Sequence, residues 1–253
     1  MNEGEKMSFT EEKREWIKKY MLEKIRQDDG AYAQKTMENF EVSITTVKRY
    51  LKECVEQKII VPNADKECGY CLITVEEEWE VDNVEDLEED TFYFDKVFPI
   101  LNDLSENSRK IWYYAFTEMM NNAIEHAKAK RICCKVKKDV LYTEISIADD
   151  GIGIFNSIRQ YADQQLHIKM DTAQARMELY KGKFTTSPES HSGEGIFFTS
   201  KMLAQFALWS EDVMYSNRCD DEAKFVRSHL IAYYTKLNRI GTMVQMKLEN
   251  DTK

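Results

Sequence analysis

The sequence predicts an α+β protein with two folded parts. In the first sixty residues apolar side chains recur at helical spacing, whereas later stretches alternate apolar and polar residues as strands do. The length of 253 residues suits one large domain or two ordinary ones, and the composition, 43% hydrophobic and 32% charged, is that of a globular chain. We expect an N-terminal domain at 1–75, an acidic linker at 76–92 and a second domain at 93–253.

The net charge of −10 comes from one segment of the chain. VEEEWEVDNVEDLEED, residues 75–90, holds ten acidic residues and no basic one, and without it 35 acidic residues remain against 35 Lys and Arg. The overall charge therefore does not argue against an anionic ligand elsewhere. A run of this kind is most often a solvated linker, and less often a segment that docks on a basic surface.

Nothing in the sequence points to a membrane or to secretion. It has no run of eighteen apolar residues, and the polar, acidic N-terminus MNEGEKMSFTEEKREW does not have the pattern of a secretory signal. We therefore expect a cytoplasmic protein without a membrane partner, whose six cysteines are mostly free thiols.

The N-terminal part reads as three helices followed by two short strands. The expected helices cover residues 10–27, 31–40 and 44–58, and the expected strands cover residues 59–63 and 70–75. Ser43 is placed to cap the third helix. The expected buried side chains are Trp16, Ile17, Tyr20, Met21 and Ile25 in the first helix, and Ile44, Val47, Leu51, Cys54 and Val55 in the third. This order of elements is that of a winged helix-turn-helix domain.

The third helix has a polar face that suits recognition of a duplex. Thr45, Arg49 and Lys52 recur at helical spacing on this face, with Lys48 beside them, as in a helix that enters a major groove. Residues 1–75, however, hold 13 basic and 14 acidic residues, so that general attraction to phosphate is weak. DNA, a regulatory protein and a purely structural role all remain open for this domain.

The second part mixes helices with alternating strands. We expect helices at 91–101, ending near Pro99, at 105–129 and at 193–206, and strands at 131–138, 140–149, 212–217, 224–235 and 242–249. The two strands at 131–138 and 140–149 are close enough along the chain to form a hairpin. Residues 155–192 are polar, with short helix-like pieces.

The helix expected at 105–129 has an apolar face and an opposite polar face that carries Glu118 and Asn122. These two residues lie one helical turn apart, so their side chains can reach one point. A carboxylate can take a proton from water, and an amide oxygen can complete the shell of Mg²⁺ beside phosphate oxygens. A plain solvated helix face is the alternative interpretation.

Acidic residues and glycines meet at the end of the strand expected at 140–149, in the sequence ADDGIGIF. Asp149 can accept a hydrogen bond from an exocyclic amine, and Gly151 and Gly153 let the backbone approach a base or ribose. A tight turn is the alternative. Later, Gly193 and Gly195 precede an apolar helix, whose free N–H groups form an anion site.

The ordered set ExxxNAxxH, DxGxG, GxG and a late strand that begins with Gly241-Thr242 resembles the GHKL superfamily of ATP-binding domains, over residues 93–250. The resemblance implies a two-layer α/β sandwich in which Mg-ATP lies between the ExxxNAxxH helix and a mobile lid at 156–192. Similar proteins often continue into another small domain. The residues that would contact the nucleotide are Asn122, Asp149, Gly151, Gly153, Ser192, Gly193, Gly195 and Thr242.

The resemblance also implies individual roles. Asn122 would bind Mg²⁺, Asp149 would bind the adenine amine with support from Thr242, and Glu118 would orient or deprotonate the attacking water or hydroxyl. His126 lies inside the first motif and is better interpreted as structural. The order of helix-turn-helix and ATP-binding domain is similar to that of a group of bacterial regulators.

These observations predict an ATP-binding regulator that hydrolyses ATP with Mg²⁺ and binds DNA or a regulatory protein through its N-terminal domain. A homodimer is compatible with this prediction. One alternative is a Ser/Thr protein kinase similar to the anti-sigma kinases, for which Glu118 would serve equally well. The other is a nucleotide sensor or transcription regulator without turnover, in which ATP or ADP only orders the lid.

Overall fold

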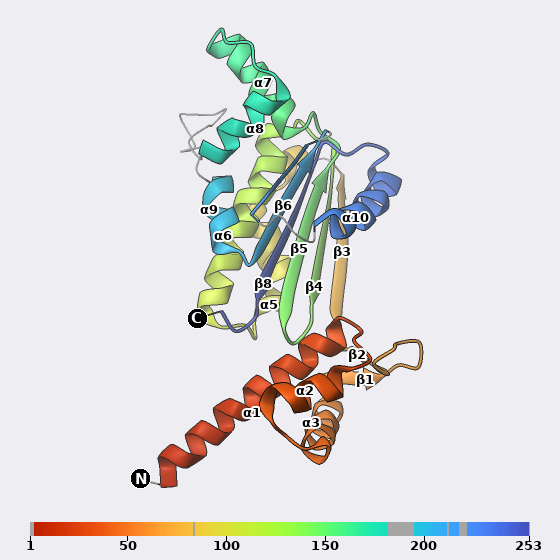
Figure 1. Cartoon of the computed structure of the whole chain (residues 1–253). Coiled ribbons are helices and arrows are strands. Elements are labelled where there is room, and N and C mark those ends of the chain that lie inside the picture. Colours follow the sequence, from red (N-terminus) through yellow and green to blue (C-terminus); the bar gives the residue numbers. More distant parts are fainter. Residues whose placement is uncertain (1–2, 83, 182–194, 212, 218–221, 253) are drawn as a thin grey trace. The chain divides into compact units, whose positions relative to one another are not determined.

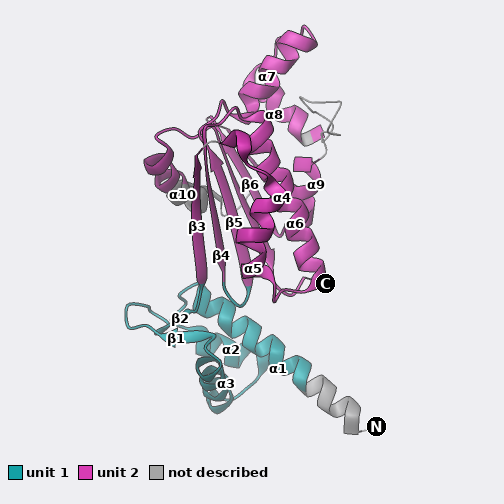
Figure 2. Ribbon diagram, turned by 180° about the vertical axis from the view of Figure 1, so that it is seen from behind, with its two compact units in different colours: residues 1–74, 139–141 teal, residues 75–138, 142–253 magenta. Residues whose placement is uncertain are grey.

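The computed structural model describes residues 3–82, 84–181, 195–211, 213–217 and 222–252. The chain divides into two compact units, residues 1–74 with 139–141 and residues 75–138 with 142–253, which are coloured separately in Figure 2. The protein is a mixed α+β structure. None of the helices described is both long enough and apolar enough to cross a lipid bilayer.

Unit 1 consists of three helices and a small antiparallel hairpin. Its elements are α1 (Glu3–Arg26), α2 (Tyr32–Phe40), α3 (Ile44–Glu56), β1 (Ile60–Pro62) and β2 (Tyr70–Leu72). The cap expected for α3 is present, since Ser43 Oγ accepts a hydrogen bond from the Thr46 N–H at 3.3 Å. The elements therefore occur in the order that the sequence predicts.

The core of unit 1 differs in part from the expected apolar faces. Ile17, Met21 and Ile25 of α1 are buried as predicted, whereas Trp16 is 60% exposed. In α3 the buried side chains are Val47, Tyr50 and Cys54, while Ile44 is 41% exposed and Leu51 and Val55 are half-buried. The buried stripe of α3 follows i, i+3 and i+7 through the aromatic side chain of Tyr50, in place of the expected Leu51.

Unit 2 is built on a six-stranded sheet in which all neighbouring strands are antiparallel (Figure 1). The strands are β3 (Val75–Asp82), β4 (Arg131–Lys138), β5 (Tyr142–Asp149), β6 (Gln205–Ser210), β7 (Val213–Ser216) and β8 (Thr242–Glu249), in the order β3-β4-β5-β8-β6-β7. The helices are α4 (Glu89–Phe92), α5 (Phe98–Leu101), α6 (Glu106–Asn121), α7 (Ile154–Gln165), α8 (Thr172–Lys181), α9 (Gly195–Met202) and α10 (Glu222–Leu237).

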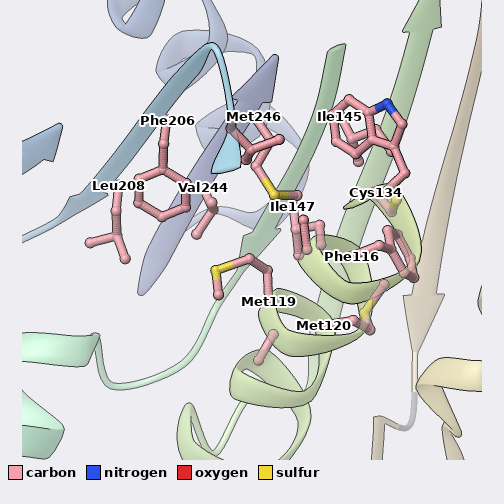
Figure 3. Close-up of a cluster of buried hydrophobic side chains, with 14 of the residues drawn as sticks. Phe116, Met119, Met120, Cys134, Ile145, Ile147, Phe206, Leu208, Val244 and Met246 are labelled. Carbon is pink, nitrogen blue, oxygen red and sulfur yellow. The ribbon is translucent and has the colours of Figure 1, made fainter. Parts of the chain in front are cut away.

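The main core lies between α6 and one face of the sheet. Figure 3 shows Phe116, Met119 and Met120 of α6 against side chains of four strands. The strand residues are Cys134, Ile145, Ile147, Phe206, Leu208, Val244 and Met246. Full burial of side chains of this size is worth about 1.5–3 kcal/mol each. The apolar face that the sequence predicts for this helix is therefore the face that holds it to the sheet.

The opposite face of the sheet carries α10, which corrects one expected element. Residues 224–235 were expected to form a strand, but they lie within a helix. Tyr233 and Leu237 of this helix are buried in a second cluster with residues from four strands, which are Cys133, Ala148, Ala207 and Met243. The Tyr233 hydroxyl also lies 2.6 Å from Ser146 Oγ. Helices thus lie on both faces, one layer more than the two-layer arrangement we expected (Figures 1 and 2).

The acidic run does not form the expected linker. Val75–Asp82 is an edge strand that pairs with β4 along its whole length. Trp79 and Val81 pack against the main core, whereas acidic side chains at alternate positions of the strand meet lysines on other elements. Glu76 pairs with Lys135 at 2.6 Å, and Glu78 pairs with Lys236 at 2.8 Å. Charge on an edge strand disfavours pairing with a further strand, so the acids suit this position.

The chain after the edge strand also stays close to the core. Val84 and Phe92 are buried in the main cluster. The helical path does not end at Pro99, because a π-helical turn, Tyr93–Val97, leads into α5, where the proline lies in the first turn. Proline is tolerated there, since the N–H groups of the first turn have no partner within the helix.

Candidate functional site

Asp149 is the last residue of β5 and is only 3% exposed. Its Oδ1 atom accepts hydrogen bonds from the backbone N–H groups of Gly151, at 2.8 Å, and Thr242, at 3.3 Å. Its backbone carbonyl accepts a third bond from Gly241 N–H at 2.7 Å. The carboxylate is therefore held by backbone N–H groups from its own turn and from the first residue of β8.

The burial of Asp149 changes its acidity. Removal from water, with a smaller contribution from neighbouring Asp150, raises the pKa of this carboxyl to about 7, although the two N–H donors and Arg239 act in the opposite direction. Both donors use Oδ1, and Oδ2 accepts no hydrogen bond from the residues that the structure describes. In its ionised form the group thus keeps one oxygen for an external donor such as an amine.

The two glycines after Asp149 are needed by the protein's own packing. A Cβ atom at Gly151 would lie 2.2 Å from the carbonyl oxygen of Ala127, which also accepts a bond from Ile152 N–H at 2.8 Å. Gly153 has a φ of +87°, which favours glycine. Protein atoms occupy the space that a side chain would need at both positions, so packing within the protein accounts for the two glycines. Their contact with a base or ribose stays a prediction.

Thr242 supports the turn through two different groups. Its N–H donates to Asp149, as described above, whereas its hydroxyl accepts from Ile154 N–H at 3.1 Å. The same Ile154 N–H lies 3.1 Å from Ser210 Oγ, and Ser210 Oγ–H donates to the Gly241 carbonyl at 2.7 Å. Sequence reasoning missed Ser210, because we extended the helix expected at 193–206 over part of the strand that carries it.

The other motif residues gather at the end of α6. Asn122 begins a π-helical turn, Asn122–His126, and its Nδ2 donates to the Glu118 carbonyl at 2.7 Å. The Asn122 side-chain oxygen makes no hydrogen bond within the described part of the chain, so its geometry fits an acceptor for a cation.

The carboxylate of Glu118 lies at the start of α9. A Cβ atom at Gly195 would come within 2.0 Å of Glu118 Oε2. The structure therefore brings Glu118 of the ExxxNAxxH motif next to Gly195 of the GxG motif, which lies 77 positions later in the sequence. Ser192 and Gly193, which belong to the same glycine motif, lie outside the described residues.

The expected lid at 156–192 is only partly described. Its first portion forms most of α7 and all of α8, and these helices contribute Ile158, Ala175 and Leu179 to the main core. Arg159 of α7 also pairs with Glu211 at 3.1 Å. Residues 182–192 lie outside the described residues. A lid that moves as one piece from residue 156 would break this packing.

The candidate nucleic-acid face of unit 1 lies on α3. Thr45, Lys48, Arg49 and Lys52 are all exposed, as expected. Lys52 forms an ion pair with Glu56 of the same helix at 3.6 Å, and the Arg49 guanidinium lies 5.0 Å from the centre of the Tyr50 ring. One of the three cations is thus partly neutralised by its own helix.

The donor atoms in the described residues do not form a self-contained metal centre, since no three His, Cys, Asp or Glu side chains gather there. A cation held by Asn122 would need most of its ligands from phosphate oxygens or water, which is the usual way in which Mg²⁺ binds. Neither a protein-family model nor a curated protein sequence matches this chain.

Proposed function

We propose that unit 2 binds ATP and Mg²⁺ in the manner of a GHKL domain, and that the chain is a nucleotide-dependent regulator with ATPase activity. The observation that carries the proposal is the Asp149 carboxylate, which is buried, held by two backbone donors through Oδ1 and left with an acceptor at Oδ2. A buried carboxylate of this kind distinguishes an adenine amine from the carbonyl that guanine carries at the same position.

The residues around α6 have complementary roles in this proposal. Asn122 supplies an amide oxygen to Mg²⁺, which when bound neutralises phosphate charge. Glu118 lies beside the first residue of α9, the helix whose N-terminal N–H groups suit a phosphate. From there its carboxylate orients the attacking water and takes its proton.

A protein hydroxyl in place of water would make the same site a Ser/Thr protein kinase, with Glu118 in the same role. A nucleotide sensor without turnover is the other candidate, in which ATP or ADP is bound but not hydrolysed. Release of inorganic phosphate, together with phosphoryl transfer to an added protein, separates the three. An ATPase releases phosphate by itself, a kinase transfers it to an added protein, and a sensor does neither.

For unit 1 we propose a winged helix-turn-helix that binds DNA through the exposed face of α3. The support for DNA binding is the set of exposed polar and basic side chains on that helix. The near-neutral charge of residues 1–75, in contrast, favours a protein partner. A gel-shift experiment at low salt with promoter-rich fragments tests this. Loss of the complex in Arg49→Ala/Lys52→Ala supports DNA binding, and absence of a complex with wild type supports a protein partner.

The nucleotide proposal is tested with Asp149→Asn. Asn keeps an oxygen for the two backbone donors but presents an NH₂ group in place of the free oxygen, so it cannot accept from an adenine amine. ATP and ADP affinity, measured by calorimetry with Mg²⁺, should fall about ten- to a hundredfold, as for the loss of one charge-assisted hydrogen bond.

The stability of the same variant is its control. The pKa of Asp149 is higher in the folded protein than in the unfolded chain, so the folded state holds more protons between about pH 4 and pH 7. The free energy of unfolding of the wild type therefore falls as the pH rises through this range. The stability of Asp149→Asn relative to wild type should accordingly increase from pH 5 to pH 8. Equal nucleotide affinity in the two proteins would refute the assignment.

A further inference from the structure

Ser210 connects two turns that lie far apart in the sequence. It is fully buried at the end of β6. Its hydroxyl hydrogen is donated to Gly241 O at 2.7 Å, and its oxygen accepts from Ile154 N–H at 3.1 Å. One side chain therefore joins the start of α7 to the turn before β8.

Both of these turns supply the donors that hold Asp149. The turn before α7 contributes the Gly151 N–H, and the turn before β8 leads directly into Thr242, the first residue of β8, whose N–H is the other donor. The three segments fit closely, since a Cβ atom at Gly153 would lie 2.7 Å from Ser210 Oγ and 3.1 Å from Gly241 O. A shift of either turn would therefore change the position of a donor to the Asp149 carboxylate.

The next residue provides a second, separate contact to the same helix. Glu211 follows Ser210 in the turn after β6 and pairs through both carboxylate oxygens with Arg159, at 3.2 and 3.1 Å. Arg159 also donates to Thr172 Oγ1 at 2.6 Å, at the start of α8. This ion pair holds α7 and α8 but contacts neither donor of Asp149, so it separates support of the helices from support of the carboxylate.

We propose that Ser210 is a positioning residue of the nucleotide site, which keeps the two turns together so that the Asp149 carboxylate presents one oxygen to the base. The identity of the ligand in this inference rests on the proposed function, whereas the hydrogen bonds of Ser210 do not depend on it. Ser210 itself does not contact the nucleotide in this proposal. Its effect passes through the backbone of Gly241 and Ile154 to the two N–H groups.

The experiment measures the protonation of the Asp149 carboxyl as a function of pH in the 253-residue chain without nucleotide. Carbon-13 NMR of the Asp149 side-chain carboxyl, assigned with Asp149→Asn, gives its titration midpoint in wild type, Ser210→Ala and Glu211→Gln. Weaker hydrogen bonding to the ionised form raises a carboxyl pKa, so Ser210→Ala should shift the midpoint upward by about half a unit or more. Glu211→Gln, in the same turn, should leave it unchanged.

A second measurement links the proton to the ligand. Adenosine affinity at pH 8, by calorimetry, should fall about three- to tenfold in Ser210→Ala and stay within twofold of wild type in Glu211→Gln. If Ser210→Ala does not fold, Ser210→Cys serves instead, because a thiol keeps only a weak donor and acceptor at this position. Its midpoint should move in the same direction.

The outcomes separate the two proposals. An unchanged Asp149 midpoint in a folded Ser210 variant overturns the positioning role, even when wild type binds adenosine. A shifted midpoint in a protein that binds neither adenosine nor ATP refutes the nucleotide site and leaves Ser210 as the support of Asp149. Equal midpoint shifts in Ser210→Ala and Glu211→Gln would assign the effect to the turn as a whole and also overturn the role of Ser210.

Discussion

The two ends of the candidate site are built in different ways. At one end, Asp149 is held by hydrogen bonds between turns that are close in space but about ninety residues apart, and it is nearly inaccessible to water. At the other end, Glu118 and Asn122 are neighbours at the end of one helix, both half-buried, and the Asn122 amide donates to the Glu118 carbonyl of the preceding turn.

This difference indicates what each end contributes. In the proposed nucleotide site, a buried carboxylate with a fixed direction selects the base, so changes at Asp149 should alter nucleotide affinity and the dependence of that affinity on pH. Half-buried side chains on a helix can adjust their rotamers, so changes at Glu118 and Asn122 should alter chemistry and metal dependence more than base recognition.

Glu118→Gln should give the largest effect. Gln keeps the size and polarity of Glu but cannot accept a proton, so phosphate release should fall about 10²- to 10⁴-fold while ATP affinity stays close to that of wild type. Steady-state phosphate release and calorimetry on the same preparation measure both quantities. Full phosphate release by this variant would reduce Glu118 to part of a polar helix face.

Nucleotide affinity of the wild type should depend on pH through Asp149. Its pKa is raised to about 7, and only the ionised carboxylate can accept from an amine, so affinity should fall about a hundredfold from pH 8 to pH 5. The residual affinity of Asp149→Asn should be flat over this range. A wild-type affinity that does not change between pH 8 and pH 5 would contradict the division between the two ends.

Asn122→Ala should act through the metal. The side-chain oxygen is the group proposed to bind Mg²⁺, so the gain in ATP affinity that Mg²⁺ provides should shrink about tenfold or less, with little change in affinity when Mg²⁺ is absent. Titrations with Mg²⁺ and with a chelator compare the two states of one sample. A loss of equal size in both titrations would show that Asn122 supports the fold of the helix end instead.

Gly195→Ala should give the smallest effect. The added methyl group would meet the Glu118 carboxylate, which is the flexible end of its side chain and can move aside. Phosphate release should therefore fall by less than about tenfold, or ~1.4 kcal/mol of transition-state stabilisation. In the Glu118→Gln background the same substitution should add little, because both changes act on one group. Additive losses would place the effect of Gly195 elsewhere.

Much of the architecture follows from local patterns in the sequence. The apolar face of α6, the hairpin of β4 and β5, and the strand β8 were all predicted, because helical and strand periodicities are properties of the segment itself. The cap at Ser43 was predicted for the same reason, since it needs only a residue three positions away. The prediction that Glu118 and Asn122 act together likewise needs only helical spacing.

The tertiary structure alone decided the rest, because the deciding partners lie far away in the chain. The acidic strand β3 lies at the sheet edge with Trp79 and Val81 on the core and acidic side chains paired with lysines from β4 and α10. The segment of α10 is helical where it packs on the sheet, although its composition favours a strand. The same holds for the Asp149 end. Ser210, Gly241 and Ile154 each form ordinary local turns or strand ends, and only the folded sheet brings them close enough for one hydroxyl to join them.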